Sequence, residues 1–364
     1  MKILLSGAFN PDFEALPDYL AAALARLGHE VHRFDHRRFL LPGRLRARVA
    51  PLDRLDRDRL NARFVATARR LRPDQIVVNQ GMVLTRRSIA TARELGARCI
   101  NWFADYPAEF EAGLAAADAY DAFHLSSSYA ARRHREAGHR RTGWLPFACD
   151  PVEHRPATPG EASSWSGSPA RVVFVGSWYP ERQILLRFLR GLPAGIWGPG
   201  WERAASDPHI APMLRGPALR PADWRGLFGR ADAVVNIHYG AFGPQETSGD
   251  LANTRVFEIL GCGAHQIVDR QGDVLRLFAE GEHLSAFSSG EELRARVEQA
   301  MTDRDRARSI AERGRARVLA AHTYEQRARA LLDGTALGFE SYPAAFAGLR
   351  SGAAPPRLAA GGRA

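Results

Sequence analysis

The sequence predicts an α/β protein with two doubly wound domains, each built on a parallel sheet. Apolar runs of strand length alternate with helix-patterned stretches throughout the chain, which is typical of parallel α/β sheets. Residues 156–169 have the Pro, Gly, Ser and Thr composition of a linker, and they separate two such series. The 364 residues are enough for two domains that each bury a core.

The first series predicts an N-terminal domain over residues 1–155. It begins with the apolar run Ile3 to Leu5, followed by a Ser6-Gly7 turn and a helical pattern that stops at Gly28. A long arginine-rich helix is expected from about Asp53 to Leu71. The further strands of this domain are expected at 30–35, 75–79, 99–104 and 122–126, and the domain closes near 144–147.

The second series predicts a C-terminal domain over residues 170–322. It begins with Val172 to Val175, a continuous apolar run before Gly176 that is typical of a buried parallel strand. Residues 323–345 are expected to form C-terminal helices, with a return to the N-terminal domain as one alternative, and 346–364 a disordered tail. Further strands are expected at 194–197, 233–238 and 265–268, and helices at 181–189, 222–228, 254–260, 291–301, 304–321 and 324–332.

Two doubly wound domains of this kind are expected to face each other across a cleft. Loops and helix N-termini gather at the carboxyl ends of parallel strands, and ligands bind there. The residues that follow each expected strand are therefore the candidates for a functional site.

The net charge of +10 comes almost entirely from arginine, because Lys2 is the only lysine. Between Arg26 and Arg72 there are fourteen arginines against five acidic residues. Residues 37–48 mix apolar and cationic side chains, so they could contact an anionic membrane surface or an acidic acceptor. The alternative is a solvated loop and helix face. Aromatic residues are few in this region, which disfavours a nucleic-acid partner.

Three cysteines, Cys99, Cys149 and Cys262, stand far apart in or beside apolar runs, which predicts core residues rather than a disulfide framework. The first apolar run is too short for a signal peptide, and no run reaches the length of a membrane span. We therefore expect a cytoplasmic protein, with a peripheral position at the inner membrane face as an alternative.

The stretch from Gly249 to Ala264 carries the strongest chemical signal. Asn253 is a good N-cap, and a helix that begins there offers free N–H groups and a positive dipole end to a phosphate. Thr254 and Arg255 lie in the first turn, where the guanidinium could donate to the same anion. Glu258, one turn later, could accept hydrogen bonds from vicinal sugar hydroxyls. The alternative is an ordinary amphipathic helix with a solvated Glu–Arg pair.

This stretch resembles the C-terminal half of CgeB-like glycosyltransferases, which belong with the group 1 transferases of the GT-B fold. The resemblance covers residues 171–332 well and the N-terminal half loosely. It implies a nucleoside-diphosphate-sugar donor bound by the C-terminal domain and hexosyl transfer with retention. The matching segments are Asn253 to Ala264, Leu275 to Phe278, Glu280-Gly281, Ser288 to Leu293 and His322 to Tyr324.

In many group 1 enzymes, two glutamates separated by seven residues contact the donor, the first at the transferred sugar and the second at the ribose. Glu258 matches the second position, whereas the first position holds Asp250, which is one methylene shorter. The contact of Asp250 with the sugar therefore stays open.

The resemblance also implies donor contacts at two loops that follow strands. Gly176 would allow close approach of a ligand, and Arg182 could hold the diphosphate. An aromatic side chain beside Gly198 could stack on the base, with core tryptophans in a tight turn as the alternative. His238 closes a strand, where it could face the donor or form a local hydrogen bond. The donor-side candidates are Gly176, Ser177, Trp178, Arg182, Trp197, Gly198, His238, Asn253, Thr254, Arg255 and Glu258.

On the acceptor side, Asp105 follows a strand and precedes a Pro-initiated helix, so it could act as general base or orient the acceptor, or cap the helix. Ser6 and Gly7, at the tip of the first strand, are expected to line the acceptor side. His124 is expected to be structural. The candidates for a catalytic role are thus Asp105, Asp250 and Glu258.

No essential metal and no other cofactor is expected. The two Asp-x-Asp triplets, at 56–58 and 303–305, fall in arginine-rich helical stretches and are interpreted as solvated faces. A GT-B epimerase or phosphorylase, or a non-catalytic basic protein that binds nucleic acid or a membrane surface, remains as an alternative function. The residues leave open the sugar, the base, the acceptor (glycan, lipid-linked, protein or small molecule) and the oligomeric state.

Overall fold

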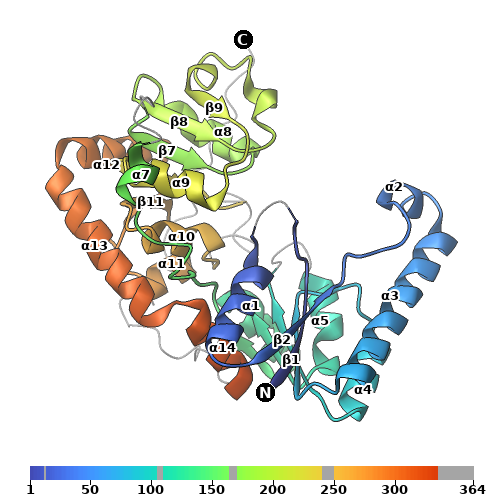
Figure 1. Cartoon of the computed structure of the whole chain (residues 1–364). Helices are drawn as coiled ribbons and strands as arrows, with labels where there is room; N and C mark the ends of the chain where they lie inside the picture. The colour runs from blue at the N-terminus through green and yellow to red at the C-terminus, as the bar shows by residue number, and fades with distance from the viewer. Residues whose placement is uncertain (12–13, 105–109, 164–169, 240–249, 335–364) are drawn as a thin grey trace. The chain divides into compact units, whose positions relative to one another are not determined.

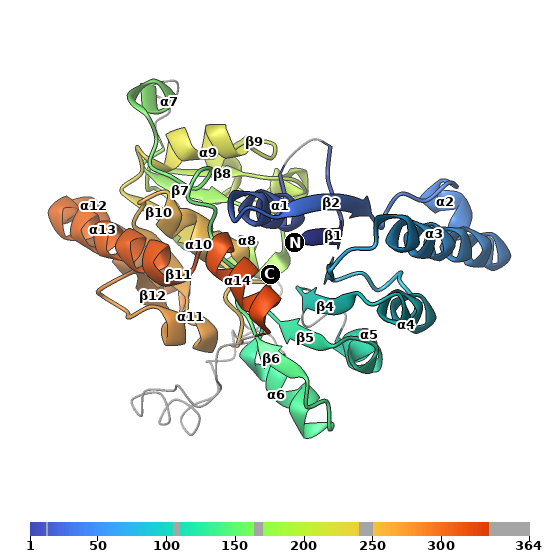
Figure 2. The ribbon, with the colours of Figure 1, turned by 60° about the horizontal axis from the view of Figure 1, so that its bottom comes forward.

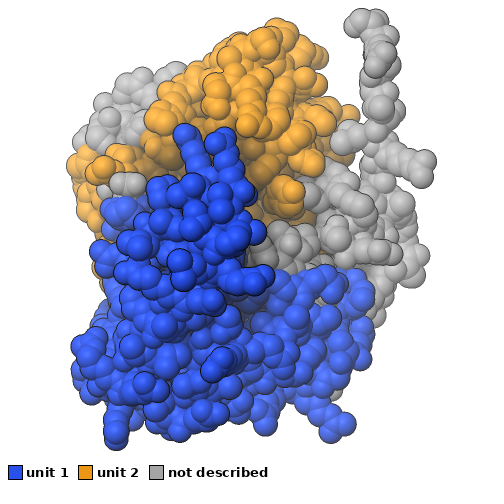
Figure 3. All heavy atoms as spheres, turned by 90° about the vertical axis from the view of Figure 1, so that its right-hand side faces the viewer, with its two compact units in different colours: residues 1–147, 324–339 blue, residues 148–323, 340–364 orange. Residues whose placement is uncertain are grey.

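The computed structural model describes residues 1–11, 14–104, 110–163, 170–239 and 250–334. The chain divides into two compact units. Unit 1 combines Met1–Phe147 with Tyr324–Phe339, and unit 2 is built on Ala148–Thr323 (Figure 3). Both units contain a six-stranded parallel sheet. The predicted fold class, two doubly wound α/β domains, is therefore confirmed.

The sheet of unit 1 has the strand order β2-β1-β3-β4-β5-β6. Helices α3, α4, α5 and α6 cover one face, and α1 and α14 cover the other (Figures 1 and 2). The strand order reverses direction at β1, and right-handed crossovers then place the helices on opposite faces. The strands are β1 (Lys2–Gly7), β2 (Glu30–Asp35), β3 (Gln75–Asn79), β4 (Arg98–Phe103), β5 (Ala122–Leu125) and β6 (Thr142–Trp144). The helices are α1 (Leu16–Arg26), α2 (Gly43–Arg46), α3 (Ala50–Leu71), α4 (Arg86–Glu94), α5 (Phe110–Ala116), the 3₁₀ turn at Ala117–Ala119, α6 (Ser128–Glu136) and α14 (Tyr324–Asp333).

The sheet of unit 2 has the order β12-β11-β10-β7-β8-β9. Its strands are β7 (Val172–Val175), β8 (Ala194–Trp197), β9 (Leu214–Gly216), β10 (Ala233–Asn236), β11 (Gln266–Asp269) and β12 (Ser285–Phe287). Its helices are α7 (Pro159–Ser163), α8 (Pro180–Leu186), α9 (Pro221–Phe228), α10 (Thr254–Gly261), α11 (Gly272–Leu277), α12 (Gly290–Thr302) and α13 (Arg304–Ala321), with 3₁₀ turns at Arg187–Leu189, Trp201–Ala204 and Ala211–Met213.

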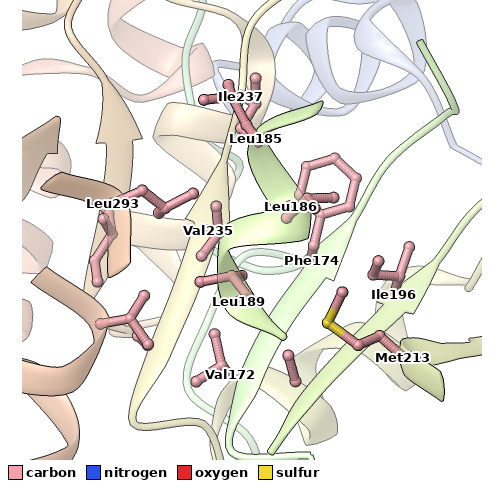
Figure 4. Close-up of a cluster of buried hydrophobic side chains, with 14 of the residues drawn as sticks. Val172, Phe174, Leu185, Leu186, Leu189, Ile196, Met213, Val235, Ile237 and Leu293 are labelled. Carbon is pink, nitrogen blue, oxygen red and sulfur yellow. The ribbon is translucent and has the colours of Figure 1, made fainter. Parts of the chain in front are cut away.

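Apolar side chains fill the space between this sheet and its helices. On one face, β7 and β10 pack against α8 and α12 through Phe174, Val235, Leu186 and Leu293 (Figure 4). On the other face, α9 and α10 contribute Trp224 and Ile259 among others. Both faces are covered, which explains why the strands form continuous apolar runs in the sequence.

One element of unit 2 lies where the sequence predicts a linker. Helix α7 falls within residues 156–169, although Pro, Gly and Ser dominate their composition. The Glu161 carboxylate accepts hydrogen bonds from Arg155 at 2.9 and 3.1 Å and from Arg225 at 2.8 Å. These arginines anchor the helix, and the composition of the segment alone does not reveal them.

Helix α14 belongs to unit 1 although it follows unit 2 in the sequence. It packs against α1, where the rings of Tyr324 and Tyr19 lie 5.5 Å apart. The buried Arg327 guanidinium donates to the carbonyl oxygens of Pro146 and Phe147 at 2.6 and 3.1 Å. The last helix is thus tied to the segment that ends the first part of unit 1.

The three cysteines are free and buried, as expected for small core residues. Among the residues that the structure describes, no helix has the length and apolar character that crossing a bilayer requires.

Candidate functional site

The candidate site lies at the carboxyl ends of β7, β10 and β11 in unit 2. These neighbouring strands end at Val175, Asn236 and Asp269, and the loops after them carry most of the donor-side candidates. The carboxyl edge of a parallel sheet is the usual place for a ligand in this class of fold.

The N-terminus of α10 is built as the sequence predicts. Asn253 is the N-cap, and its Oδ1 accepts a hydrogen bond from the N–H of Val256 at 3.1 Å. The same side chain exchanges two amide hydrogen bonds with Asn236 at the end of β10, at 2.9 and 3.2 Å. The first turn of α10, with Thr254 and Arg255, is therefore fixed to the sheet edge, where the positive end of the helix dipole can face a ligand.

His238 fixes the same helix end from a second direction. Its Nε2 accepts the backbone N–H of Asn253 at 3.0 Å, so the ring proton resides on Nδ1. Nδ1 lies 2.8 Å from Oδ1 of Asp269, which also accepts the backbone N–H of His238. Because both ring nitrogens are engaged and the side chain is buried, His238 positions the helix and does not itself reach a ligand.

Asp269 completes this buried chain of hydrogen bonds. Its Oδ2 accepts from Nε2 of Gln271 at 2.6 Å. Burial acts to raise the pKa of Asp269, but the hydrogen bonds from His238 and from the amide of Gln271 outweigh it and lower the pKa below its usual range. A carboxylate that stays ionised keeps the imidazole oriented.

Arg255 and Glu258 lie one turn apart on α10. Nη1 of Arg255 is 3.0 Å from Oε2 of Glu258, and the guanidinium stacks over the ring of Trp224 at 4.6 Å. Nη1 is buried and forms no hydrogen bond with any residue that the structure describes. The guanidinium is thus held beside the first turn of α10 by the Glu258 carboxylate and the ring of Trp224, and a guanidinium in this position suits recognition of an anion.

Arg182 has a different environment from the one expected of a free phosphate ligand. Its guanidinium donates twice to the carbonyl of Ile237, at 2.9 and 2.7 Å, and once to the carbonyl of Ser177 at 2.8 Å. It also stacks over the ring of Tyr179 at 4.8 Å. Burial lowers the pKa of Arg182 to about 10, and the charge of Arg255 contributes to this shift. The side chain therefore joins the loop after β7 to the end of β10, and its positive charge remains near Arg255.

The loops after β7 and β8 are packed closely on each other. A Cβ at Gly198 would lie 2.0 Å from the carbonyl oxygen of Gly176, so this contact requires glycine. Trp178 donates its indole N–H to Gln183 at 2.8 Å and is half-buried. Trp197 is buried in the core between the sheet and α9, the position that the core-tryptophan alternative describes.

Asp250 is held by an ion pair. Its Oδ1 is 3.2 Å from Nη2 of Arg276 on α11, and Nη1 of the same arginine contacts Asp273. Asp250 therefore belongs to a group of charges beside α10, eight residues before Glu258.

The acceptor-side candidates lie in unit 1. Ser6 is fully buried, with its Oγ 3.1 Å from Nδ1 of His36, so its side chain does not line an open surface. A Cβ at Gly7 would lie 2.5 Å from Cβ of Pro17, so glycine there allows α1 to approach β1. Asp105 lies outside the described residues. His124 is buried within β5, as expected of a structural residue.

The two Asp-x-Asp triplets differ in exposure. Asp303, Arg304 and Asp305 are all exposed, as expected of a solvated face, whereas in the other triplet only Arg57 and Asp58 are exposed. Asp56 is buried, and its carboxylate accepts the backbone N–H groups of Leu40 and Leu41 at 2.9 Å each. Asp303 is the N-cap of α13 and accepts the N–H of Arg306 at 3.1 Å. Both have structural roles. Within the described ranges, no group of three His, Cys, Asp or Glu side chains is arranged to hold a metal ion.

Sequence reasoning missed Asn236, Asp269 and Trp224. A signal was available for the first two, since each is the polar last residue of an apolar strand at the ligand-binding edge of the sheet. Trp224 carried no such signal, because it reaches Arg255 only through the packing of α9 on α10.

Residues 182–333 match a family model described as Glycosyl transferase-like. This match covers α8 to α14 and includes most of the site described above. The predicted reaction class, glycosyl transfer, is thereby confirmed. None of the curated proteins matches the chain by sequence.

The fold resembles solved GT-B structures. Alr3699/HepE from Anabaena, in complex with UDP-glucose, gives a TM-score of 0.66 at 16% identity, over 92% of this chain and 99% of that one. Sucrose-phosphate synthase from Thermosynechococcus elongatus gives 0.66 at 13% identity, over 91% and 97%. A putative UDP-N-acetylglucosamine 2-epimerase from Listeria monocytogenes gives 0.55 at 11% identity, over 97% and 98%. Proteins of different activities therefore share the fold, and function must be argued from the site.

Proposed function

We propose that this glycosyltransferase binds a nucleoside-diphosphate sugar at the N-terminus of α10 and transfers a hexosyl group to an acceptor without a metal ion. The observation that carries the proposal is the preorganised helix end. Asn253 caps it, His238 and Asn236 fix it, and the Arg255 guanidinium is held in its first turn by Glu258 and Trp224. A pyrophosphate is the anion that such a combination of amide dipoles and guanidinium recognises.

In the proposed reaction, the bond between the anomeric carbon and the pyrophosphate oxygen breaks, and the acceptor oxygen forms the new glycosidic bond. Negative charge develops on the leaving nucleoside diphosphate, where the first turn of α10 and Arg255 stabilise it. Arg182 adds positive charge nearby, since the charge of Arg255 is close enough to lower the pKa of Arg182. Glu258 would accept hydrogen bonds from ribose hydroxyls, and Asp250 would face the sugar. On a retaining course the acceptor proton passes to the departing pyrophosphate oxygen, and Asp105 is our candidate for orienting the acceptor. On an inverting course Asp105 would instead take the proton as general base.

The retaining course and the CgeB-like subfamily are also proposals, and both rest on the resemblance of residues 253–264 and the segments around them. Alr3699/HepE was solved in complex with UDP-glucose, so a uridine-diphosphate sugar is the first donor to try. An epimerase or phosphorylase with the same fold is the alternative enzyme.

The test is donor turnover by Arg255→Ala and Glu258→Ala, with release of nucleoside diphosphate measured with and without candidate acceptors. Arg190, which is exposed just after the 3₁₀ turn that follows α8, provides the control Arg190→Ala. We expect the two site variants to lose turnover and the control to keep it. Full activity in both site variants would refute the assignment. Acceptor-independent conversion of the sugar without release of diphosphate would favour the epimerase.

We also propose that unit 1 contacts an anionic membrane surface, which would place the enzyme peripherally at the inner membrane face. Helix α2 and the first turns of α3 extend away from the sheet of unit 1 (Figure 1). Four exposed apolar residues cluster there, with relative exposures of 65% for Leu40, 42% for Leu45, 37% for Val49 and 64% for Leu55.

Cationic side chains surround this apolar cluster. Arg44, Arg48 and Arg54 are exposed, whereas Arg46 is engaged by Asp53 at 2.9 Å and stacks on Phe39. Apolar residues between arginines suit the interface of an anionic bilayer. Co-sedimentation with vesicles that contain phosphatidylserine tests the contact. Leu40→Asp combined with Leu55→Asp should abolish it, whereas Leu95→Asp, another exposed leucine of unit 1, should not. Equal binding to neutral vesicles would argue against the proposal.

A further inference from the structure

A pocket lies at the edge of the unit 2 sheet opposite the candidate donor site, where the strands begin. Arg171 directly precedes β7 and Asp232 directly precedes β10, and both line a pocket of about 370 Å³. Helix α13 forms another wall through Arg304 and Arg308. The candidate donor site lies at the other ends of these strands, so the pocket is separate from it. Its volume is that of small-molecule sites.

The rim of the pocket has an excess of positive charge. Four arginines line it, Arg171, Arg230, Arg304 and Arg308, against two carboxylates, Asp232 and Glu312. The Asp232 carboxylate forms ion pairs with two of the arginines, since its Oδ1 lies 2.6 Å from Arg171 and 3.3 Å from Arg304. Neither Arg230 nor Arg308 forms an ion pair with any residue in the described ranges. Two guanidinium groups are thus available to an anion, and Arg304 and Arg308 repel each other across one helical turn unless an anion lies between them.

Three buried polar atoms beside the pocket lack partners among the described residues, and one of them, Nδ1 of His265, can donate or accept according to the tautomer of the ring. Nε of Arg171 has a hydrogen to donate, and Oδ2 of Asp232 can accept one. Asp232 is almost entirely buried, so bulk water does not readily satisfy Oδ2. The pocket therefore offers donors to an anion and one buried acceptor to a hydroxyl or amino group.

The remaining wall combines small side chains with the rings of Phe228 and His265. Five alanines and two glycines line the pocket, which leaves room for more than a phosphate ion. A ligand that fills it needs an anionic group for the arginines, a donor for Oδ2 of Asp232 and a short carbon skeleton for the alanines.

We propose that this pocket binds a small phosphate ester that carries a free hydroxyl group. The phosphate lies between Arg308, Arg304 and Arg230, and the hydroxyl donates to Oδ2 of Asp232. The binding does not depend on the function proposed for the other edge of the sheet.

Isothermal titration at low salt with glycerol 3-phosphate, inorganic phosphate and glycerol tests the proposal on the full chain. We expect glycerol 3-phosphate to bind more tightly than inorganic phosphate, and glycerol alone not to bind. Arg304→Ala combined with Arg308→Ala should weaken the ester by at least about ten-fold, the loss expected for one charge-assisted hydrogen bond. Arg313→Ala is the matched control, an exposed arginine of α13 outside the pocket, and should leave affinity unchanged.

Two further variants separate the possible failures. Asp232→Asn replaces Oδ2 with a donor, so it should remove the preference for the ester over inorganic phosphate. Arg255→Ala alters only the candidate donor site and should leave the titration unchanged. If Arg255→Ala abolishes the heat of binding while the double variant at Arg304 and Arg308 keeps it, the ester binds at the donor site. In that case the pocket proposal is wrong, while the proposed function stands. Equal losses of affinity for glycerol 3-phosphate in Arg313→Ala and in the double variant would also overturn the pocket proposal.

Discussion

The backbone N–H of Asn253 donates a hydrogen bond to Nε2 of His238 at 3.0 Å, and this bond joins the end of β10 to the start of α10. The two residues are 15 positions apart, and the imidazole between them is oriented by Asp269. The helix end that we propose for pyrophosphate binding thus depends on a histidine that does not touch the ligand.

Replacement of this histidine should weaken donor binding through the helix. His238→Phe leaves the N–H of Asn253 without its partner, which costs about 1–3 kcal/mol for an unsatisfied buried group. It also removes one hydrogen bond from the Asp269 carboxylate, which keeps those from the backbone N–H of residue 238 and from Gln271. We expect a lower melting temperature and a raised KM for the donor, with a smaller change in kcat. The measurement is steady-state kinetics beside thermal unfolding, with the exposed His32→Ala as control. An unchanged KM at reduced stability would assign His238 to the fold alone.

The N-cap permits a separation of stability from binding. Asn253→Asp keeps an oxygen that accepts the N–H of Val256, so the helix should retain its cap, whereas Asn253→Ala should lose about 1 kcal/mol of stability. The added negative charge of the aspartate opposes a pyrophosphate. Because aspartate also loses the hydrogen bond from Nδ2 to Oδ1 of Asn236, we expect Asn253→Asp to melt somewhat below the parent temperature and to show no thermal shift with uridine diphosphate. A full shift would place the diphosphate elsewhere.

The guanidinium of Arg255 should matter for its shape as well as its charge. Arg255→Ala removes a charge-assisted hydrogen bond to the leaving group, and we expect kcat/KM to fall about ten- to one-hundred-fold. Arg255→Lys keeps the charge but loses the planar stack on Trp224, so it should recover only part of this loss. Complete recovery with lysine would show that charge alone is needed, and equal activity of all three proteins would contradict the site.

Buried histidines predict a loss of stability in mild acid. Burial lowers the pKa values of His36, His124 and His265 to about 4 from 6.5 in the unfolded chain. The unfolded state therefore binds protons more tightly, and stability that is complete above pH 6.5 is lost as the pH falls towards 4. Thermal unfolding measured from about pH 7.5 to about pH 4 should show this decline.

One of these histidines offers a sharper test of the same effect. Neither ring nitrogen of His124 has a hydrogen-bond partner among the described residues. His124→Phe should therefore fold without loss at about pH 7.5 and reduce the slope of stability against pH. A steeper slope in the variant would contradict the assignment of that proton uptake to His124.

Local signals were enough to predict part of this molecule. The apolar runs predict the two parallel sheets because strands buried on both faces leave that pattern in the chain. Asn253 was found as a cap because an N-cap acts on residues two or three positions ahead. The position of the helix end and the place of Arg255 in its first turn can thus be predicted from a few neighbouring residues.

Contacts between distant residues could not be predicted in this way. The sequence predicts Arg182, in the first turn of a helix, as a ligand of phosphate, but its guanidinium donates to the carbonyl of Ile237, 55 residues away. Asp56 resembles a solvated helix residue, but it binds the backbone of a loop 15 and 16 residues earlier. In both cases the side chain's role is set by an element that the fold brings to it.

The membership of α14 in unit 1 has a consequence for the order in which the protein folds during synthesis. The strands of unit 1 are complete by Trp144, yet Tyr324 and Leu331 in its core leave the ribosome only after all of unit 2. Unit 2, which is translated second, can therefore complete its core first. Until α14 has been synthesised, the surface of α1 in unit 1 stays uncovered. A nascent chain stalled before residue 324 should expose that surface to chaperones.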